Sequence, residues 1–340
     1  MKVRLLHFRK ALSAALFVLL LTVAGTKNAL AQNLVATLKH GDNISFYYGA
    51  NALVDAHNDA ETGDIITLSS GTFAPTEITK AITLRGAGCM EDTISGVYPT
   101  VINENIVFNV EDTENYLTVE GISFSSNTNY YKTLHNPRFI KCYFQRLVNQ
   151  WPAQMNNAQF ENCLFFIFGF EDAHNTILIN CGIFAAEYMS SNDRSVTAFN
   201  SFIRLHNDNA NCLTAYNCII CGNSENNYCN VIGGSSVVYN CIGIKDGCSS
   251  WPFNNIPTYN CMEVDDYDDV FEEFWPNFIL KEDIATSFLG NDGTEVGLYG
   301  GFMPYTSRPS YQIVKHYSVP NKSDAQGRLN VGIELYSEDE

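Results

Sequence analysis

The feature that most restricts the fold of this chain is a repeat of about 20 residues in its central part. Short apolar segments recur there at intervals of 17 to 23 residues. The position that anchors each segment is occupied by Ile122, Cys142, Cys163, Cys181, Ser201, Cys218, Cys241 and Cys261. An asparagine directly precedes the last six anchors, at Asn162, Asn180, Asn200, Asn217, Asn240 and Asn260. This pattern predicts one structural unit that is repeated many times.

A unit of this length with short strands and no helical periodicity is typical of one coil of a parallel β-solenoid, an all-β fold. Asparagine suits a fixed corner of the coil because it tolerates positive φ. The chain has 36 Asn against 20 Lys and Arg, which favours turns over long charged helices. A leucine-rich repeat would need a leucine framework, and an immunoglobulin-like sandwich would lack the identical corner.

Composition and charge exclude two classes of protein. The hydrophobic fraction of 46% and the aromatic fraction of 13% are enough for a large core, so the chain is not disordered as a whole. The formal charge of −17 argues against nucleic acid as a partner, because phosphate binding needs basic surfaces.

Residues 1–31 have the pattern of a secretory signal peptide. Lys2, Arg4, Arg9 and Lys10 precede a short apolar run, and small residues end at Ala31. The run is too short to span a bilayer, and no later segment is long and apolar enough to do so. We therefore expect an exported protein that is secreted, periplasmic or on the cell surface, and that does not span the membrane.

The flanking segments carry a resemblance to a known superfamily. Gly63–Leu68, Gly71–Phe73 and Ile82–Gly88 are similar to the opening coils of the pectin-lyase-like right-handed parallel β-helix superfamily, in its exported bacterial type. In that group a short helix often closes the N-terminal end of the core, and Ala52–Ala60 has the spacing for it. Asp292–Thr294 and Gly297–Gly301 resemble the closing segment of such proteins.

The predicted organisation has four parts: a signal peptide at 1–31, an N-terminal cap at 32–62, the β-helix at 63–303 and a C-terminal hairpin tail at 304–340. Leu329, Val331, Ile333 and Leu335 alternate with polar residues as in a half-buried strand. Ser310–Val319 is the expected partner strand, with the turn at Asp324–Gly327. Since an isolated hairpin is marginal in water, the tail is expected to dock on the solenoid or on another protein.

The eleven cysteines divide into two groups. The six at anchor positions should form a buried stack of thiols, because in-register stacking holds them farther apart than a disulfide prefers. The other five are Cys89, Cys212, Cys221, Cys229 and Cys248. Cys212–Cys229 and Cys221–Cys248 are geometrically possible disulfides across adjacent coils, and a zinc site of Cys212, Cys218, Cys221 and Cys229 is a weaker alternative.

The resemblance implies one route to catalysis, that of a polysaccharide lyase with Arg or Lys as the base and calcium holding the substrate carboxylate. The nearest residues are Arg204, His206 and Asp208, with Lys245 and Asp246 two coils later. The alternative interpretation, which we favour, is that these are solvated loop residues. A glycoside hydrolase needs two carboxylates. Asp193 with Asp208, and Glu171 with Asp172 and Glu187, are pairings that no register singles out.

We predict no metal site and no cofactor. If an ion does bind, the candidate is Ca²⁺ at the acidic run 265–273. That run lacks the glycine-spaced loop of calcium motifs, so a solvated surface is the simpler interpretation.

The aromatic residues suggest ligand binding instead. Phe199, Tyr216, Tyr239 and Tyr259 stand two residues before four successive anchors. If they point outward they form a stripe suited to sugar rings, and if they point inward they are core. Trp151, Trp251 and Trp275 each precede a proline, which places them in extended or turn backbone, where recognition and packing are both open.

The function predicted from the sequence is that of an exported, non-catalytic, glycan-binding or adhesive surface protein, with a polysaccharide or cell-surface glycan as its partner. The alternative is a polysaccharide lyase or glycoside hydrolase that uses Arg204, His206 and Lys245. A purely structural module with the tail as its docking element is a third interpretation.

Overall fold

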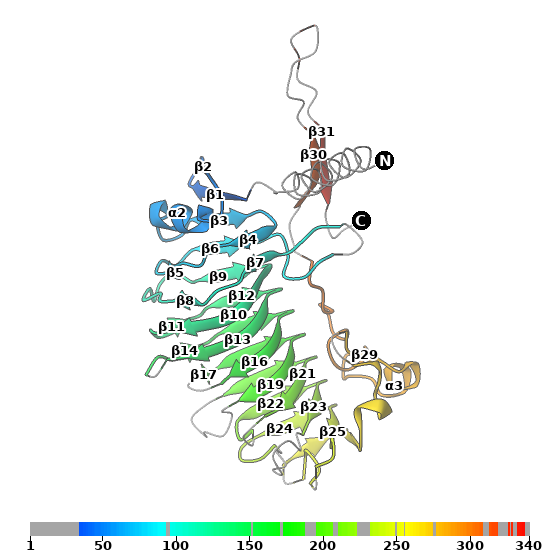
Figure 1. Cartoon of the computed structure of the whole chain (residues 1–340). Coiled ribbons are helices and arrows are strands. Elements are labelled where there is room, and N and C mark those ends of the chain that lie inside the picture. The colour runs from blue at the N-terminus through cyan, green and yellow to red at the C-terminus, as the bar shows by residue number, and fades with distance from the viewer. Residues whose placement is uncertain are drawn as a thin grey trace, which may run out of the picture. The chain divides into compact units, whose positions relative to one another are not determined.

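The chain folds as a parallel β-solenoid, which confirms the predicted all-β parallel β-helix (Figure 1). The computed structural model describes residues 34–92, 96–150, 152–170, 173–187, 195–206, 210–222, 232–248, 250–254, 256–274, 277–308, 313–318, 326, 328 and 332–336. The predicted signal peptide lies outside these residues.

Sheet A forms one side of the coils and contains 12 of the described strands. In spatial order they are β2 (Asn43–Tyr48), β1 (Val35–His40), β3 (Ile65–Leu68), β6 (Thr83–Arg85), β9 (Thr118–Glu120), β12 (Arg138–Ile140), β15 (Gln159–Glu161), β18 (Thr176–Ile179), β20 (Val196–Phe199), β22 (Leu213–Tyr216), β24 (Val237–Tyr239) and β26 (Thr258–Tyr259). From β3 onward every neighbouring pair is parallel, as successive coils of a solenoid require.

Sheet B forms a second side. Its strands are β4 (Gly71–Phe73), β7 (Thr100–Ile102), β10 (Ile122–Tyr130), β13 (Tyr143–Asn149), β16 (Leu164–Gly169), β19 (Gly182–Glu187), β21 (Phe202–Leu205), β23 (Ile219–Cys221), β25 (Ile242–Ile244) and β27 (Met262–Val264), with β5 (Glu77–Ile78) and β8 (Ile106–Phe108) attached. A short third sheet contains β11 (Leu134–His135), β14 (Met155–Asn156) and β17 (Ala173–His174).

The hydrophobic core lies inside the coils and receives side chains from all three sheets. Phe139 of sheet A, Phe144 of sheet B and Met155 of the third sheet are all fully buried. Phenylalanines from successive coils stack in register, with ring centroids 5.0 Å apart for Phe139–Phe160 and for Phe124–Phe144. The repeated position two residues after the anchor is therefore core.

The asparagines before the anchors turn the chain from sheet A into sheet B, as predicted. Their φ angles lie between 46° and 56°. Gly121 and Lys141 occupy the same corner in the two preceding coils, also at positive φ. This backbone conformation costs little for Gly and Asn, which explains the repeated choice of asparagine.

A second row of asparagines was not predicted. Asn136, Asn157 and Asn175 follow the strands of the third sheet and also have positive φ. Their side chains are hydrogen-bonded from coil to coil: Asn157 Nδ2 donates to Asn136 Oδ1 at 3.0 Å, and Asn175 Nδ2 donates to Asn157 Oδ1 at 3.2 Å.

The anchor cysteines form a ladder of thiols, as predicted. Cys142, Cys163, Cys181, Cys218 and Cys241 are buried, and all six anchor cysteines are free. The backbone N–H of Cys218 donates to Cys241 Sγ, and that of Cys241 donates to Cys261 Sγ, both at 3.4 Å. Burial raises the pKa of Cys163 and of Cys241 well above the ordinary thiol value, so these thiols are poor nucleophiles.

Outside this ladder, one alternative for the remaining cysteines is contradicted. Cys221 is a free thiol whose Sγ–H donates to Tyr267 Oη at 2.7 Å, so the Cys221–Cys248 bridge is absent. Cys221 is the last residue of strand β23, and its thiol contacts a tyrosine of a later segment instead. Cys229 lies outside the described residues, and with it the Cys212–Cys229 alternative.

The N-terminal end of the core is closed by helix α2 (Ala52–Asp59), within the predicted Ala52–Ala60. Leu53 and Ala56, three residues apart, are fully buried on one face of the helix. The strand pair β1–β2 before it was not predicted. Since β1 pairs antiparallel with both β2 and β3, this hairpin extends sheet A beyond the first coil.

Helix α2 makes stability depend on pH through His57. This residue is buried, and its Nε2 accepts the N–H of Thr79 at 3.2 Å. Burial, with a smaller effect of Lys80, lowers the pKa of His57 to about 4. The unfolded chain therefore binds a proton below pH ~6.5 that the folded chain does not bind until pH ~4.

We expect the free energy of unfolding to fall by up to about 3 kcal/mol as the pH drops through this window, because of His57 alone. Urea titrations at pH 7 and pH 4.5 measure the loss. His57→Gln keeps an acceptor for Thr79 but does not titrate, so it should show a smaller loss. Equal losses in the two proteins would contradict the assignment.

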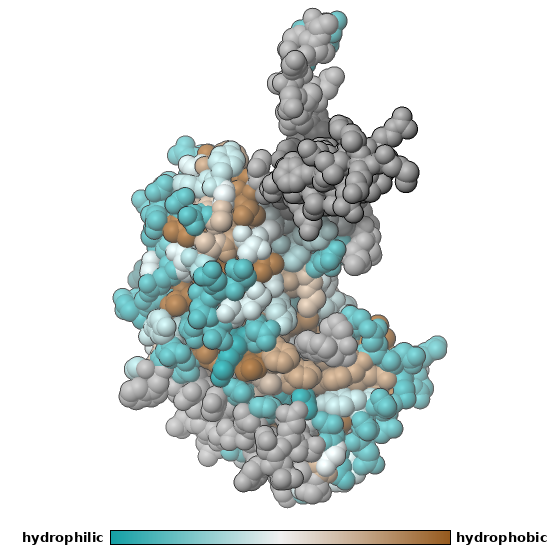
Figure 2. Space-filling view, in the orientation of Figure 1, coloured by the Kyte–Doolittle hydropathy of each residue, from teal (hydrophilic) through white to brown (hydrophobic). Residues whose placement is uncertain are grey.

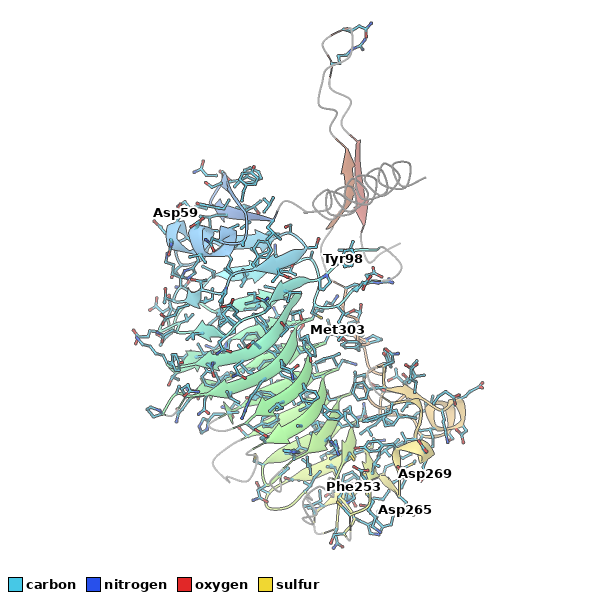
Figure 3. All side chains as sticks on the ribbon, viewed as in Figure 1. Asp59, Tyr98, Phe253, Asp265, Asp269 and Met303 are labelled. Carbon is cyan, nitrogen blue, oxygen red and sulfur yellow. The ribbon has the colours of Figure 1, made fainter. Side chains whose placement is uncertain are left out.

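After β27 the chain leaves the coils and covers the outer face of sheet B. This segment, which we call the cover, contains η3 (Tyr267–Asp269), β28 (Phe271–Glu273), β29 (Ile279–Leu280) and α3 (Glu282–Ser287). Its side chains form a second hydrophobic core with Phe202, Ile219 and Ile242, which lie in register on sheet B. Figure 3 shows side chains filling the space between the ribbon of sheet B and the ribbon of the segment that covers it. The predicted β-helix range 63–303 thus contains a cover as well as coils.

The corner asparagines hold the end of this cover in place. Asn180 Nδ2 donates to the carbonyl oxygens of Leu298 and Gly300 at 2.7 and 2.8 Å. Asn217 Nδ2 donates to Asn291 Oδ1, and the N–H of Asn291 donates back to Asn217 Oδ1. The glycine-rich segment that the sequence marked as closing therefore docks on the asparagine corner.

The C-terminal end of the coil stack is closed by Phe253, which Figure 3 labels there. Gly243 in the preceding coil leaves room for Phe253, since a Cβ at Gly243 would lie 2.9 Å from the Phe253 ring.

The predicted tail hairpin is confirmed in its strands, β30 (Ile313–Ser318) and β31 (Gly332–Tyr336), which pair antiparallel. Most of the predicted turn lies outside the described residues.

Candidate functional site

The outer face of sheet A carries a ladder of aromatic rings, which settles the direction of the stripe. Phe199, Tyr216, Tyr239 and Tyr259 occupy one column of parallel register. Their ring centroids are 4.8 to 5.1 Å apart, and the ring planes differ by 6° to 9°. Phe199 and Tyr259 are exposed, and the two rings between them are half-buried. The stripe therefore points to solvent.

Stacking limits what this aromatic ladder can offer to a ligand. Each inner ring has both faces against a neighbouring ring, so Tyr216 and Tyr239 present edges and hydroxyl groups. Tyr259, at the last coil, has one face that no ring of the ladder covers, and it is 54% exposed. Contact with the face of a sugar ring is therefore best placed at Tyr259.

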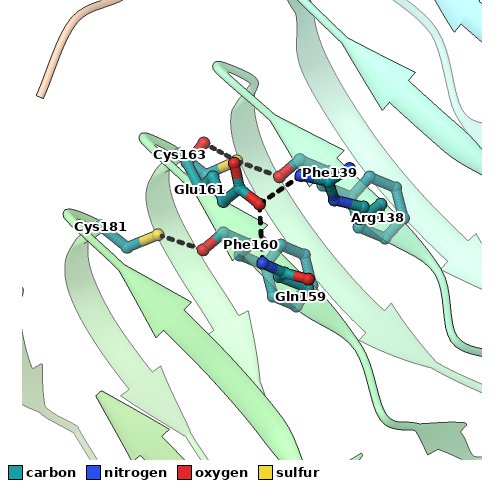
Figure 4. Close-up of polar contacts among 7 residues, drawn as sticks. All are labelled: Arg138, Phe139, Gln159, Phe160, Glu161, Cys163 and Cys181. Atoms are coloured by element: carbon teal, nitrogen blue, oxygen red, sulfur yellow. Dashed lines mark hydrogen bonds and ion pairs between the residues drawn. The ribbon is translucent and has the colours of Figure 1, made fainter. Parts of the chain in front are cut away.

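In earlier coils the same column contains charged and aliphatic residues in place of the aromatic rings: Arg85, Glu120, Ile140, Glu161 and Ile179. Glu161, whose side chain is 8% exposed, accepts from Arg138 Nη2 at 2.7 Å and from Gln159 Nε2 at 2.7 Å (Figure 4). Glu120 pairs with Arg85 Nε at 3.6 Å one coil away. Sheet A thus changes from charged to aromatic along its length.

Arg204 lies on the outer face of sheet B, where the cover begins. Its side chain is 12% exposed, its Nη2 lies 3.5 Å from Asp246 Oδ2, and its guanidinium lies 5.0 Å from the centroid of Phe184. The neighbouring Cys221 bonds to Tyr267 of the cover. These contacts are those of a packed structural arginine rather than of an accessible base.

Lys245 and His206 lie in two different surroundings. Lys245 Nζ lies 4.8 Å from the centroid of the Trp251 ring and 3.8 Å from Asp265 Oδ1. His206 Nδ1 instead lies 3.5 Å from Glu187 Oε1. The predicted partner Asp208 lies outside the described residues, as do Asp193, Glu171, Asp172, Trp151 and Trp275.

A polar pocket of about 250 Å³ opens on sheet B. It is lined by Asn127, Asn129, Arg146, Val148, Asn149, Gln150 and Gly169. Arg146 on β13 reaches past the intervening strand β16 to Glu187 on β19, with Nη2 3.5 Å from Glu187 Oε2. His206 Nδ1 lies 3.5 Å from Oε1, the other oxygen of the Glu187 carboxylate. The pocket therefore adjoins a Glu187 held between two basic groups.

The sequence did not reveal this pocket as a site. Arg146, Glu187 and His206 stand four, six and five residues after their anchors, so the repeat does not align them. A register shift between β19 and β21 brings His206 next to Glu187, and Arg146 reaches the same carboxylate from two strands away and two residues out of register. The one available signal was the concentration of Asn and Gln around 127–150, which reads equally well as turn-forming sequence.

No metal centre was found in the described part of the chain: no three His, Cys, Asp or Glu residues there are placed to hold an ion. In the acidic run, Asp266 accepts the N–H of Tyr267 at 2.7 Å, and Asp269 accepts the N–H of Asp266. These two carboxylates cap η3.

Figure 2 shows one face of the molecule, with apolar residues in brown forming a band beside polar surface. Within the described residues, no helix has the length and apolar character needed to cross a bilayer.

Comparison with known proteins gives no relative. No protein family model, no curated protein and no solved structure matches the chain.

Proposed function

We propose that this chain is an exported, non-catalytic glycan-binding protein whose solenoid faces carry the contacts. The observation that supports this most is the outward aromatic ladder on sheet A. Aromatic rings next to hydroxyl groups combine apolar contact with hydrogen bonding, which is the chemistry that a sugar ring offers. The threonines of the neighbouring column, Thr197 and Thr214, add further hydroxyls to the face.

The ladder predicts unequal effects for its rings. Tyr259→Ala should lower affinity for a bound oligosaccharide by about tenfold, because its open face is the best stacking surface. Tyr239→Ala should have a smaller effect, since its ring is covered on both sides. Binding to an array of neutral and acidic glycans, followed by calorimetry on the best ligand, measures both.

Tyr116→Ala is the matched control, because Tyr116 is also 54% exposed but lies outside the ladder. If the protein bound no glycan on the array, or if Tyr116→Ala and Tyr259→Ala lowered the affinity equally, the proposal would be contradicted.

The alternative function, polysaccharide lyase, has weaker geometric support. It needs an accessible base beside the substrate carbon, whereas Arg204 is packed against Phe184 and Asp246. Release of unsaturated uronides, followed by absorbance and abolished by Arg204→Ala, would replace the binding proposal with the enzymatic one.

A further inference from the structure

The polar pocket on sheet B has features that the aromatic ladder lacks. It is concave, and its lining side chains, apart from Val148 and Gly169, carry amide or guanidinium groups. We infer that this pocket is a second glycan site, which binds one residue of a neutral sugar. The inference rests on the proposed function and names the class of glycan.

The donors and acceptors of the lining fit hydroxyl groups. Asn and Gln amides both donate and accept, as sugar hydroxyls do, and the Arg146 guanidinium adds fixed donors. Gln150 Nε2 donates to Asn129 Oδ1 at 3.4 Å, which orients both side chains. Asn149 Nδ2 donates to the Ala153 carbonyl oxygen at 3.1 Å, so it is also held in place. Such pre-oriented groups lose little conformational entropy when a ligand binds.

Gly169 lines the pocket and leaves open space beside Val148. It lies between Val148 and Glu187 on neighbouring strands, and a Cβ there would lie 3.1 Å from Val148 Cγ1. Because Gly169 has no side chain, this part of the pocket lining is backbone, with the Val148 side chain beside it. The volume of about 250 Å³ is smaller than that of pockets for drug-sized ligands, so it limits the bound portion to about one sugar ring.

Charge favours a neutral ligand over an acidic one. Arg146 is the one cation of the lining, and its guanidinium faces the Glu187 carboxylate, whose side chain is 8% exposed. The Glu187 carboxylate offsets the charge of Arg146, which weakens its attraction for the carboxylate of a uronate. The formal charge of −17 on the whole chain adds to the repulsion of a polyanion.

The test uses calorimetry with the full chain against neutral gluco-, galacto-, manno- and xylo-oligosaccharides and uronate oligosaccharides of matched length. We expect binding of at least one neutral oligosaccharide, reduced about tenfold or more in Arg146→Ala. Asn127→Ala, at an exposed position on the rim, should also reduce it without disturbing the Glu187 pair.

Arg138→Ala is the matched control, since Arg138 also pairs with a buried glutamate but on sheet A. It should leave binding unchanged.

The outcomes separate this inference from the proposed function. Neutral binding that is lost in Tyr259→Ala but unchanged in Arg146→Ala and Asn127→Ala would overturn the pocket and leave the glycan-binding function in place. Binding of uronates alone, dependent on Arg146, would overturn the neutral class. Absence of binding to every oligosaccharide would overturn both proposals.

Discussion

Replacing Phe160 with alanine should lower the free energy of unfolding by about 3 to 5 kcal/mol. Phe160 is fully buried, and its ring lies 5.0 Å from Phe139, 5.3 Å from Phe165 and 5.1 Å from Phe168, measured between centroids. The substitution removes apolar surface and leaves a cavity between coils that cannot close, because the strand spacing is fixed by backbone hydrogen bonds. Urea denaturation followed by circular dichroism measures the change.

Phe302→Ala provides the control, because this ring is completely exposed. We expect its effect to stay within about 0.5 kcal/mol. A loss below about 1 kcal/mol in Phe160→Ala would mean that the stacked rings do not form the core described above.

Replacing Asn180 should release the cover from the coils. Its side chain is buried, and it donates to two carbonyl oxygens of the closing segment, Leu298 O and Gly300 O. Asn180→Ala leaves both acceptors without this donor and places alanine, which tolerates positive φ less well than asparagine, at φ 49°, so we expect a loss of about 2 to 4 kcal/mol. Faster amide hydrogen exchange at 296–301 should accompany it.

Asn180→Gly separates the two causes, since glycine adopts positive φ without strain but donates no side-chain hydrogen bond. It should recover about 1 kcal/mol of the loss while leaving the faster exchange unchanged. If Asn180→Gly restored the slow exchange as well, the side-chain hydrogen bonds would not be what holds the cover.

The sequence predicted the coils well because their determinants are local. Positive φ at the corner favours Asn or Gly, which occupy it in every coil from Gly121 to Asn260 except that of Lys141, and the inward position two residues after the anchor is a buried apolar side chain from Phe124 to Ile220. Both requirements repeat with the coil, so they appear in the sequence as a period. The buried thiols at Cys163 and Cys241 follow from the same register.

The cover and the site were harder to predict because their determinants are not local. Phe202, Ile219 and Ile242 point away from the core inside the coils. They are buried only because a segment that follows dozens of residues later packs on them. The second row of corners follows strands of two residues, which are too short to show a periodicity. His206 meets Glu187 because β19 bulges relative to β21, and Arg146 reaches Glu187 from two strands away; spacing in the sequence encodes neither the bulge nor the long reach.

The thiol ladder has a consequence for how such a chain must mature. Each anchor sulfur is hydrogen-bonded to the backbone of the preceding coil, so it is sheltered only when its own coil has docked, and the six cysteines become resistant to oxidants one after another as assembly advances. In an oxidising compartment, a pause midway would leave the thiols of the coils not yet docked open to sulfenylation or mispairing. Speed of coil addition, rather than final stability, would then set the yield of intact protein.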